Sequence, residues 1–306
     1  MKIYILSRAP NLYSTHRLWL SVSSRGHEVK IVDYTRCHLL LRDGQPIVLY
    51  EGFPLELPDA IIPRIGATYT QEGVALIRHF ENMGVATTLS SQALVEARDK
   101  LHCLQSLARQ GIQIPATVAV YAPEHLALAL EVVGGVPVII KLVEGTHGAG
   151  VVLAHTEQTA ISVVEAFART RQKILLQEYI AEAKGTDIRA FVIDGVVVAA
   201  MERVAAAGEF RANLHRGATA RSIQLSFAEL QLAKRATTHL KLGVAGVDIL
   251  RSERGPLLLE VNASPGLEGI EGATGVAIGR KIVSYVERMV RQEPGSSSGQ
   301  TFATKE

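Results

Sequence analysis

The sequence contains few cysteines and no excess of charge of one sign. Cys37 and Cys103 are its two cysteines among 306 residues, and they lie far apart without histidines at zinc-ligand spacing. We therefore expect reduced thiols in a cytoplasmic protein rather than a disulfide framework. The 32 basic and 30 acidic residues leave a formal charge of +2. This balance argues against direct binding of nucleic acid, which requires a dominant basic face.

Long apolar runs are missing as well. No stretch of 18 apolar residues occurs, so we expect no membrane span. The start, MKIYILSRAP, has one lysine and too short an apolar run for a signal peptide. The tail 293–306 lacks apolar periodicity and is predicted to be disordered. Because 47% of the residues are hydrophobic, a substantial core is possible, and the length suggests two or three subdomains.

Several common nucleotide-binding and catalytic motifs are also absent. The first predicted strand is not followed by G-x-G-x-x-G, so the N-terminal unit is not expected to bind NAD. The glycine-rich segment EGTHGAG at 144–150 lacks G-K-[ST] and precedes a predicted strand, not a helix, which excludes a P-loop. No Ser-His-Asp or Cys-His signature is present, as expected for phosphoryl transfer, which depends mainly on positioning and charge neutralisation.

The order of predicted elements indicates an α/β domain followed by two α+β pieces. Residues 1–95 read as a doubly wound unit, with a helix that starts at Ser14 as N-cap and stops by Gly26. The second unit, 96–175, begins with a helix over 97–111, and the third covers 176–292. Within the third unit, Asp194–Gly195 predicts a hairpin, and 204–221 is polar and irregular. The predicted strands are 2–6, 29–33, 59–66, 114–120, 137–144, 151–154, 173–180, 187–194, 196–203, 244–250 and 257–263.

The segment around 141–150 is typical of a phosphate site. Gly145, Gly148 and Gly150 let backbone N–H groups approach a phosphate, although a plain flexible hairpin remains the alternative. Lys141 lies on an apolar strand four residues before Gly145 and needs an anionic partner, which a bound phosphate would supply. Alternatively, its ammonium group reaches solvent at a strand edge.

Three oxygen-bearing side chains lie on the last two predicted strands. Glu260 and Asn262 share one face of the strand LLLEVN, because strand side chains alternate with a period of two. The short turn RSERG allows antiparallel pairing that brings Asp248 beside them. Oxygen ligands without sulfur or imidazole favour Mg²⁺ or Mn²⁺. The alternative is a carboxylate paired with a nearby arginine.

A series of motifs in fixed order resembles a known family. The series consists of ARDK, VIIKLVEGTHGAGV, LLQEYI, GTDIRAFV, NLHRGA, VAGVDIL and LLLEVNASPGLEGIE, and together these resemble the ATP-grasp fold with an N-terminal Rossmann-like, pre-ATP-grasp α/β domain. With ILSRAPNLYSTHRL and LHRGA, the chain is similar to RimK-type α-L-glutamate ligases over roughly residues 1–290. That family commonly has Gln where His147 stands, but the glycines remain.

The resemblance implies roles for individual residues. Lys100 and Lys141 would contact ATP phosphates from two subdomains, and backbone groups of Glu178 and Tyr179 would read adenine. Asp187 would bind the ribose hydroxyls. Arg211, Ala212 and Asn213 would lie at the triphosphate or acyl phosphate, and the catalytic candidates are Arg203, Arg211 and Asn213. Asp248, Glu260 and Asn262 would bind two Mg²⁺ or Mn²⁺ ions. The candidate contacts of substrate carboxylates are Arg189, Arg203, Arg216 and Ser264.

The resemblance also implies an activity. The chain would use ATP to add free L-glutamate to the C-terminal carboxylate of small-subunit ribosomal protein six through an acyl phosphate, and it would form a homo-oligomer. Synthesis of free poly-α-glutamate is a related possibility. The alternatives are an ATP-grasp ligase for a small molecule or carrier protein and a non-catalytic ATP-binding regulatory module.

Overall fold

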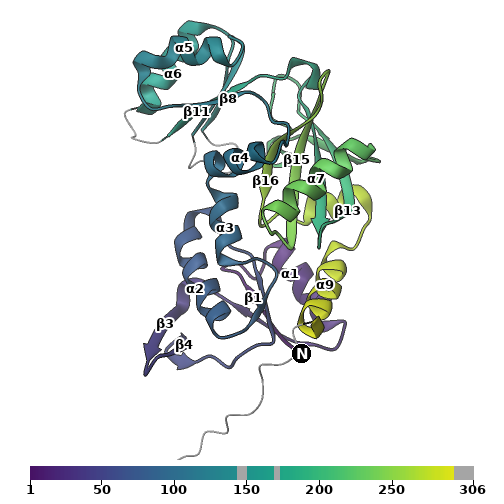
Figure 1. Cartoon of the computed structure of the whole chain (residues 1–306). Coiled ribbons are helices and arrows are strands. Elements are labelled where there is room, and N and C mark those ends of the chain that lie inside the picture. The colour runs from purple at the N-terminus through teal and green to yellow at the C-terminus, as the bar shows by residue number, and fades with distance from the viewer. Residues whose placement is uncertain (143–149, 169–172, 293–306) are drawn as a thin grey trace, which may run out of the picture.

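The computed structural model describes residues 1–142, 150–168 and 173–292, and Figure 1 shows how they are arranged. The predictions for Gly145, Gly148 and the tail 293–306 lie outside these residues. In the described part, no helix is long and apolar enough to cross a membrane. Short 3₁₀ turns occur at Tyr34–Arg36, Ala67–Tyr69, Pro123–His125, Ala181–Ala183 and Leu214–Arg216.

The N-terminal domain is built on a four-stranded parallel sheet. Its strands are β1 (Lys2–Leu6), β2 (Glu28–Val32), β6 (Ala60–Pro63) and β7 (Ala86–Thr87), in the order β2-β1-β6-β7. Helices α1 (Tyr13–Ser23) and α2 (Thr70–Asn82) connect these strands. The parallel pairing confirms the predicted Rossmann-like domain. Because β1 has β2 on one side and β6 on the other, the strand order reverses at β1, and the carboxyl ends of β1 and β6 flank the switch point.

A small antiparallel sheet interrupts this domain. It consists of β3 (Cys37–Arg42), β4 (Gln45–Tyr50) and β5 (Phe53–Pro54). We predicted no element here from the sequence. The turn between β3 and β4 contains Asp43 at φ 53° and Gly44 at φ 73°, and an Asp-Gly pair favours this type of hairpin turn.

Two predictions about helix ends are wrong. Ser14 is not an N-cap, because α1 begins at Tyr13 after Leu12, and the Ser14 hydroxyl instead accepts a hydrogen bond from the Leu267 N–H at 3.0 Å. The helix predicted over 97–111 is two helices, α3 (Ser91–Arg98) and α4 (Lys100–Arg109). The break falls at Asp99, whose carboxylate accepts the His102 N–H at 3.0 Å and so caps α4.

The central unit forms a separate lobe, which we call the lid. Its sheet has the order β10-β9-β11-β8, formed by β8 (Thr117–Val120), β9 (Val138–Leu142), β10 (Val151–Ala154) and β11 (Ile174–Glu178). Helices α5 (Leu126–Val132) and α6 (Glu157–Ala168) pack on it, and they share a hydrophobic core drawn from the lid alone. Figure 1 shows the lid standing above the rest of the molecule. The predicted boundary at 175/176 falls inside β11.

The C-terminal sheet carries most of the predicted site residues. It has the order β14-β13-β12-β15-β16, formed by β12 (Thr186–Ile193), β13 (Val196–Val204), β14 (Thr219–Ser222), β15 (Val244–Ser252) and β16 (Gly255–Asn262), with helices α7 (Phe227–His239), α8 (Glu268–Thr274) and α9 (Ile278–Gln292). The predicted hairpin is confirmed, because β12 and β13 pair antiparallel around Asp194 and Gly195, both at positive φ. The stretch predicted to be irregular contains β14.

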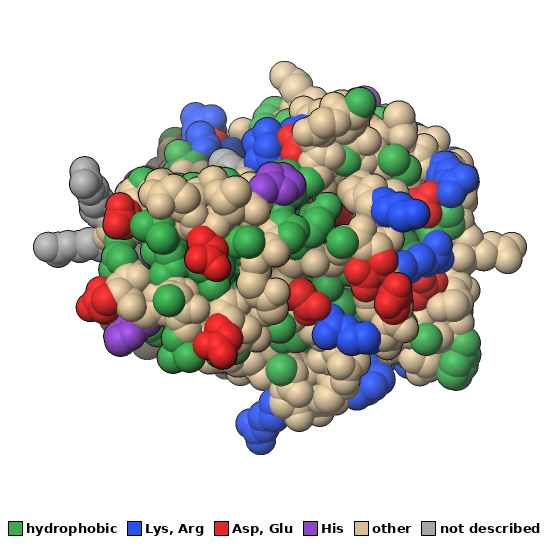
Figure 2. Space-filling model, turned by 90° about the horizontal axis from the view of Figure 1, so that it is seen from above, with side chains coloured by type: hydrophobic (Ala, Val, Ile, Leu, Met, Phe, Trp, Pro, Cys, Tyr) green, Lys and Arg blue, Asp and Glu red, His purple; other side chains and the backbone are tan. Residues whose placement is uncertain are grey.

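The N-terminal and C-terminal domains share their cores and form one body. One buried cluster joins Tyr4 and Phe80 to Val192 and Val247, and a second joins Ile3 to residues of α9. The body therefore holds the two domains in fixed relation, whereas the lid has a core of its own. Seen from above the lid, the surface carries acidic and basic side chains interspersed among hydrophobic ones (Figure 2).

Candidate functional site

The last two strands bring together the three oxygen-bearing residues predicted as metal ligands. In the antiparallel register of β15 and β16, Asp248 lies opposite Glu260, and Gly246 lies opposite Asn262. The Asn262 amide Nδ2 donates to Oε1 of Glu260 at 3.1 Å, so the two side chains share a face as predicted. The short turn and the alternation along the strand were sufficient to predict this arrangement.

Asp248 is engaged by two arginines. Arg189 donates from Nε to Oδ1 at 2.7 Å and from Nη2 to Oδ2 at 2.6 Å. Arg203 donates from Nη2 to Oδ2 at 2.9 Å, and it also holds Asp187 through bonds of 2.6 and 2.8 Å. The pairing with arginine that the sequence left open as an alternative is therefore present. Arg203 connects two buried aspartates, and Arg189 completes the network.

The network gives its two aspartates different ionisation behaviour. Burial raises the pKa of Asp187, although Arg203 opposes the shift. Burial also disfavours the charged form of Asp248, but Arg189 and Arg203 outweigh it and hold its pKa at about 2. Asp248 therefore stays ionised at neutral pH, as a ligand of a hard cation must.

The donor set fits a hard cation. Asn262 donates its amide N–H to Glu260 and keeps its carbonyl oxygen for another partner. Glu260 forms no ion pair within 1–142, 150–168 and 173–292. Oδ1 of Asp248 accepts one hydrogen bond and can accept a second interaction, since a carboxylate oxygen has two lone-pair directions. The three residues thus offer oxygens suited to Mg²⁺.

Lys141 is held in the lid by a chain of polar side chains. Its Nζ donates to Oε1 of Gln177 at 2.6 Å, and Gln177 donates from Nε2 to Oγ1 of Thr117 at 2.9 Å. Burial lowers the pKa of Lys141 to about 8, while the charge of Glu260 acts in the opposite direction. Lys141 has an amide partner here and no carboxylate partner among the described residues, so it is placed to accept an anionic ligand.

Lys100 approaches the same region from the body. It is the first residue of α4, and its Nζ donates to the Leu142 carbonyl of β9 at 3.2 Å. Burial lowers its pKa, and Glu260 raises it. Because Glu260 acts electrostatically on both Lys100 and Lys141, and the two lysines act on one another, these residues of three different elements face one site.

Arg211 makes a second bridge from body to lid. Its Nη1 donates to the Val151 carbonyl of β10 at 3.2 Å, while Nε and Nη2 bind Glu209 at 2.9 and 2.8 Å. These bonds hold the pKa of Glu209 at about 2. Leu142 precedes the segment 143–149, and Val151 follows Gly150. Lys100 and Arg211, two of the three cations predicted to meet phosphate, therefore contact residues on either side of the glycine-rich segment.

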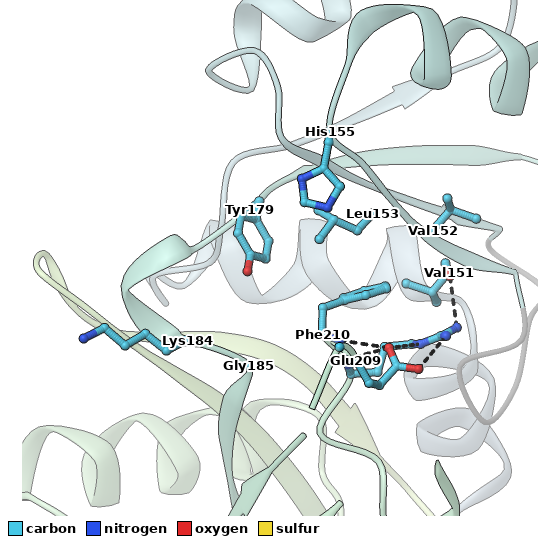
Figure 3. A pocket seen from close by; sticks show the side chains of 11 residues that line it. Val151, Val152, Leu153, His155, Tyr179, Lys184, Gly185, Glu209 and Phe210 are labelled. Carbon is cyan, nitrogen blue, oxygen red and sulfur yellow. Dashed lines mark hydrogen bonds and ion pairs between the residues drawn. The ribbon is translucent and has the colours of Figure 1, made fainter. Parts of the chain in front are cut away.

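A cavity of about 600 Å³ opens beside this bridge (Figure 3). Tyr179 and His155 lie on one side of it, and Glu209 and Phe210 on the other. Arg211 also lines the cavity. The cavity lies between lid and body, next to the predicted adenine hinge. Its walls come from β10, from the residues that follow β11, and from the loop that follows β13.

Glu178, predicted to belong to the adenine hinge, is bonded to both units. Its N–H donates to the Ala116 carbonyl at 2.8 Å, and its carboxylate accepts the Ala116 N–H at 3.0 Å. Arg254 of the body donates to the same carboxylate at 2.7 and 2.8 Å. Glu178 therefore connects β8, β11 and the β15–β16 turn.

The other predicted residues are distributed around this centre. Gly150 has φ 73°, and a Cβ there would lie 3.0 Å from Leu142, so the position requires glycine. The Asn213 side chain accepts the His215 N–H at 3.3 Å, Ala212 is buried, and Arg216 lies 3.8 Å from Glu209. Oγ of Ser264 is buried, and no described residue forms a hydrogen bond with it.

Two residues of this site were missed by sequence reasoning. Gln177 supports Lys141, and strand pairing could have indicated it: Lys141 lies opposite Leu175, which makes Gln177 its diagonal neighbour on the same face. Glu209 neutralises Arg211 from two residues away, but it lies in a loop where no periodicity predicts direction.

Two protein-family models together match nearly the whole chain. A RimK PreATP-grasp domain model matches residues 1–94, and a RimK-like ATP-grasp domain model matches 97–286. A protein of Picosynechococcus sp. named probable alpha-L-glutamate ligase is 53% identical over 94% of this chain and 96% of its own. A protein of the same name from Serratia proteamaculans is 50% identical over 96% of this chain and 98% of its own.

Solved structures confirm the predicted ATP-grasp fold. The ATP-grasp ligase PsnB, in a complex with a variant precursor, Mg and ADP, superposes with a TM-score of 0.73 at 22% identity, covering 94% of this chain and 98% of PsnB. The D-alanine–D-alanine ligase of Bacillus anthracis, complexed with ATP, has a TM-score of 0.70 at 16% identity, covering 95% of this chain and 98% of that one.

The ion-pair network predicts the effect of removing its shared cation. Arg203→Met leaves Asp187 and Asp248 buried with too little compensation, so we expect a loss of about 3–5 kcal/mol in the free energy of unfolding at pH 7. Asp248 keeps Arg189 in this variant, whereas Asp187 loses the arginine that opposes its raised pKa. The folded-state pKa of Asp187 then lies further above its unfolded value, so the loss should shrink as the pH falls towards 5. Urea unfolding at both pH values measures it.

Arg221→Met is the matched control, because it removes an exposed arginine paired with Glu202. This exposed pair should contribute less than about 1 kcal/mol. Equal losses in the two variants would contradict the bridging role of Arg203.

Proposed function

Because the chain belongs to the RimK-like ATP-grasp family and is an ATP-dependent carboxylate–amine ligase, we propose that it joins the amine of free L-glutamate to a peptide C-terminal carboxylate. The proposal is carried by the position of Lys100, whose Nζ reaches from the body to the Leu142 carbonyl, next to Lys141 in the lid. The charge of Glu260, on β16 (the metal strand), acts on both lysines. Two half-buried cations near a set of oxygen ligands suit a metal-bound triphosphate.

The proposed reaction has two steps. An oxygen of the acceptor carboxylate attacks the γ-phosphorus of ATP, the bond to the β-phosphate oxygen breaks, and ADP leaves. The glutamate amine then attacks the carbonyl carbon of the acyl phosphate, loses a proton, and expels inorganic phosphate as the amide forms. Mg²⁺ bound by Glu260, Asn262 and Asp248 would neutralise charge on the β- and γ-phosphates.

The residues of the chain would position charge rather than form covalent bonds. Lys141 and Lys100 would bind phosphate oxygens from opposite sides of the cleft, and Arg211 would join them by exchanging part of its pairing with Glu209 for the nucleotide. Glu178 and Tyr179 would present backbone groups to adenine. Arg203 would act as a positioning residue, because its bonds orient Asp187 near the ribose and Asp248 near the metal.

We propose small-subunit ribosomal protein six as the acceptor, because the series of motifs in this chain resembles that of the enzymes that extend this ribosomal protein. We also propose that glutamate itself can serve as acceptor, which would give free poly-α-glutamate. Supporting the assignment of glutamate, relatives about 50% identical over nearly their whole length are named probable alpha-L-glutamate ligase.

The acceptor can be tested by mass. Incubating the protein with ATP, Mg²⁺, glutamate and the ribosomal protein should produce acceptor masses that increase by one glutamyl residue at a time, with one ADP released for each addition. A second sample with an acceptor whose C-terminal carboxylate is amidated should show no increase. Glutamate-dependent ADP release with unchanged acceptor mass would contradict this acceptor and favour free poly-glutamate.

The metal assignment predicts a large loss of activity in Glu260→Gln. The amide keeps the shape of the side chain and removes the charge, so turnover should fall by about 100-fold or more. Glu253→Gln, in the exposed β15–β16 turn, is the control and should keep normal turnover. Unchanged turnover in Glu260→Gln would contradict the role of Glu260 as a metal ligand.

Burial of Lys141 predicts that ATP binding weakens at alkaline pH. With its pKa near 8, Lys141 is protonated below that pH in the free protein, whereas a bound triphosphate would raise its pKa. Above pH 8, ATP binding therefore requires uptake of a proton, and the Kd should rise by up to about tenfold per pH unit. Calorimetric titration between pH 7 and 9.5 measures this dependence.

Lys141→Arg provides the comparison, since a guanidinium does not titrate in this range. Its ATP affinity should depend less on pH than that of the unaltered protein. The same pH dependence in both proteins would show that another group causes it.

A further inference from the structure

The switch point of the N-terminal sheet faces the metal strand. In open α/β sheets, ligands bind in the crevice outside the carboxyl ends of the strands where the strand order reverses. Here those ends belong to β1 and β6, and Arg64 directly follows β6. The loop Ala263–Gly266, which follows β16, lies against this edge, because Nη2 of Arg64 donates to the Pro265 carbonyl at 2.7 Å. The proposed nucleotide and metal contacts do not involve this edge.

Two arginines at this edge have no acidic partner in the part of the chain that the structure describes. Arg64 binds the Pro265 carbonyl, and Arg98, at the end of α3, donates from Nη2 to the Ile65 carbonyl at 2.6 Å. Nε of Arg98 is buried and has no hydrogen-bond partner among the described residues. Among the described residues, neither arginine forms an ion pair with a carboxylate, although each guanidinium carries five N–H donors. Unused donors of this kind are typical of an anion site.

Without an anion nearby, the positive charges of Arg64 and Arg98 are energetically unfavourable, because both are partly removed from solvent and they repel one another. Burial lowers the pKa of Arg64 to about 10, and the positive charge of Arg98 adds to that shift. Burial also lowers the pKa of Arg98. Both residues are half-buried rather than fully buried. A carboxylate would bind a guanidinium through two parallel hydrogen bonds and offset the repulsion between the two charges.

Ser264 connects this pair to the reaction centre. Within 1–142, 150–168 and 173–292, its buried Oγ has no hydrogen-bond partner, and Ser264 lies two residues after Asn262 and next to Pro265. Two residues of chain span at most about 7 Å. A ligand held by Arg64, Arg98 and the Ser264 hydroxyl would therefore lie beside the metal strand.

We propose that Arg64 and Arg98, with the Ser264 hydroxyl, bind the carboxylates of the amino-acid substrate. This inference rests on the proposed function and names the subsite for its amine donor. Two guanidinium groups can pair with the two carboxylates of a dicarboxylic amino acid, and the amine of that amino acid needs neither of them. The acceptor carboxylate is a poorer match, because it must attack phosphorus, and a carboxylate oxygen that accepts two charged hydrogen bonds is a weak nucleophile.

A purely structural role is the competing explanation. Arg64 joins the N-terminal domain to the C-terminal loop, as Arg25 does through its bonds of 2.7 and 2.5 Å to Glu287 of α9. Arg25→Gln is therefore the matched control, because it removes an arginine contact between the same two domains away from the crevice.

Steady-state kinetics and calorimetry test the subsite. Arg64→Lys and Arg98→Lys keep the charge and lose the forked geometry, so the KM for glutamate should rise about tenfold, and Arg98→Gln should raise it about 30-fold or more. The KM values for ATP and for the acceptor should stay unchanged. Titration of glutamate into the protein with Mg²⁺ and a non-hydrolysable ATP analogue should show the same loss of affinity, whereas Arg25→Gln should bind glutamate normally.

The possible outcomes separate this inference from the proposed function. An unchanged KM for glutamate in Arg64→Lys and Arg98→Lys, or a KM that rises for the acceptor alone, would overturn the subsite. A lower Tm without a change in glutamate binding would show that the arginines are structural and would overturn it too. If the unaltered protein releases no ADP with glutamate, the proposed function fails. In that case the subsite would still be supported if calorimetry shows that glutamate binds the unaltered protein and that Arg64→Lys and Arg98→Lys both weaken this binding.

Discussion

The Arg203 guanidinium neutralises two aspartates that are buried on neighbouring strands. Asp187 on β12 and Asp248 on β15 share this cation from β13, and Arg189 completes the charge balance at Asp248. Two buried carboxylates without these partners would be very costly. Because the network fixes the side-chain directions on three adjacent strands, it also fixes where Asp248 stands relative to Glu260 on the fourth. The proposed metal site depends on this arrangement.

The division into body and lid follows from the packing. The N-terminal and C-terminal domains share buried clusters, whereas the lid has its own. Lys100 and Arg211 cross the boundary by donating to the Leu142 and Val151 carbonyls. These contacts link the body to the two ends of the glycine-rich segment, so a bound triphosphate would meet charges from both units.

The proposed amino-acid subsite would lie on the opposite side of β16 from the proposed nucleotide site. The lysines approach β16 from α4 and from the lid, and Arg64 approaches the loop after β16 from the N-terminal domain. A nucleotide and an amino acid would then lie on opposite sides of the chain segment around Asn262. The N-terminal domain has no dinucleotide fingerprint, yet it still presents the carboxyl ends of its parallel strands to a ligand.

Much of this protein could be predicted from local patterns. Period-two alternation places Glu260 and Asn262 on one face, and the Asp194–Gly195 turn predicts a hairpin. These two features depend on residues close together in sequence. The ATP-grasp fold was predicted instead from the resemblance of a series of motifs that is spread over much of the chain. Local patterns failed where a competing local preference or a distant contact decided: Asp99 caps α4 and breaks the predicted helix, and Ser14 binds Leu267 rather than capping α1.

Only the tertiary structure decided how the charges are shared. Arg203 and Asp248 are 45 residues apart, and Arg64 and Pro265 are 201 residues apart, so no spacing rule could pair them. The sequence by itself determined which residue types were available and on which face of each strand they lie. The packing of the domains then determined which carboxylates receive an arginine and which arginines form no ion pair among the described residues.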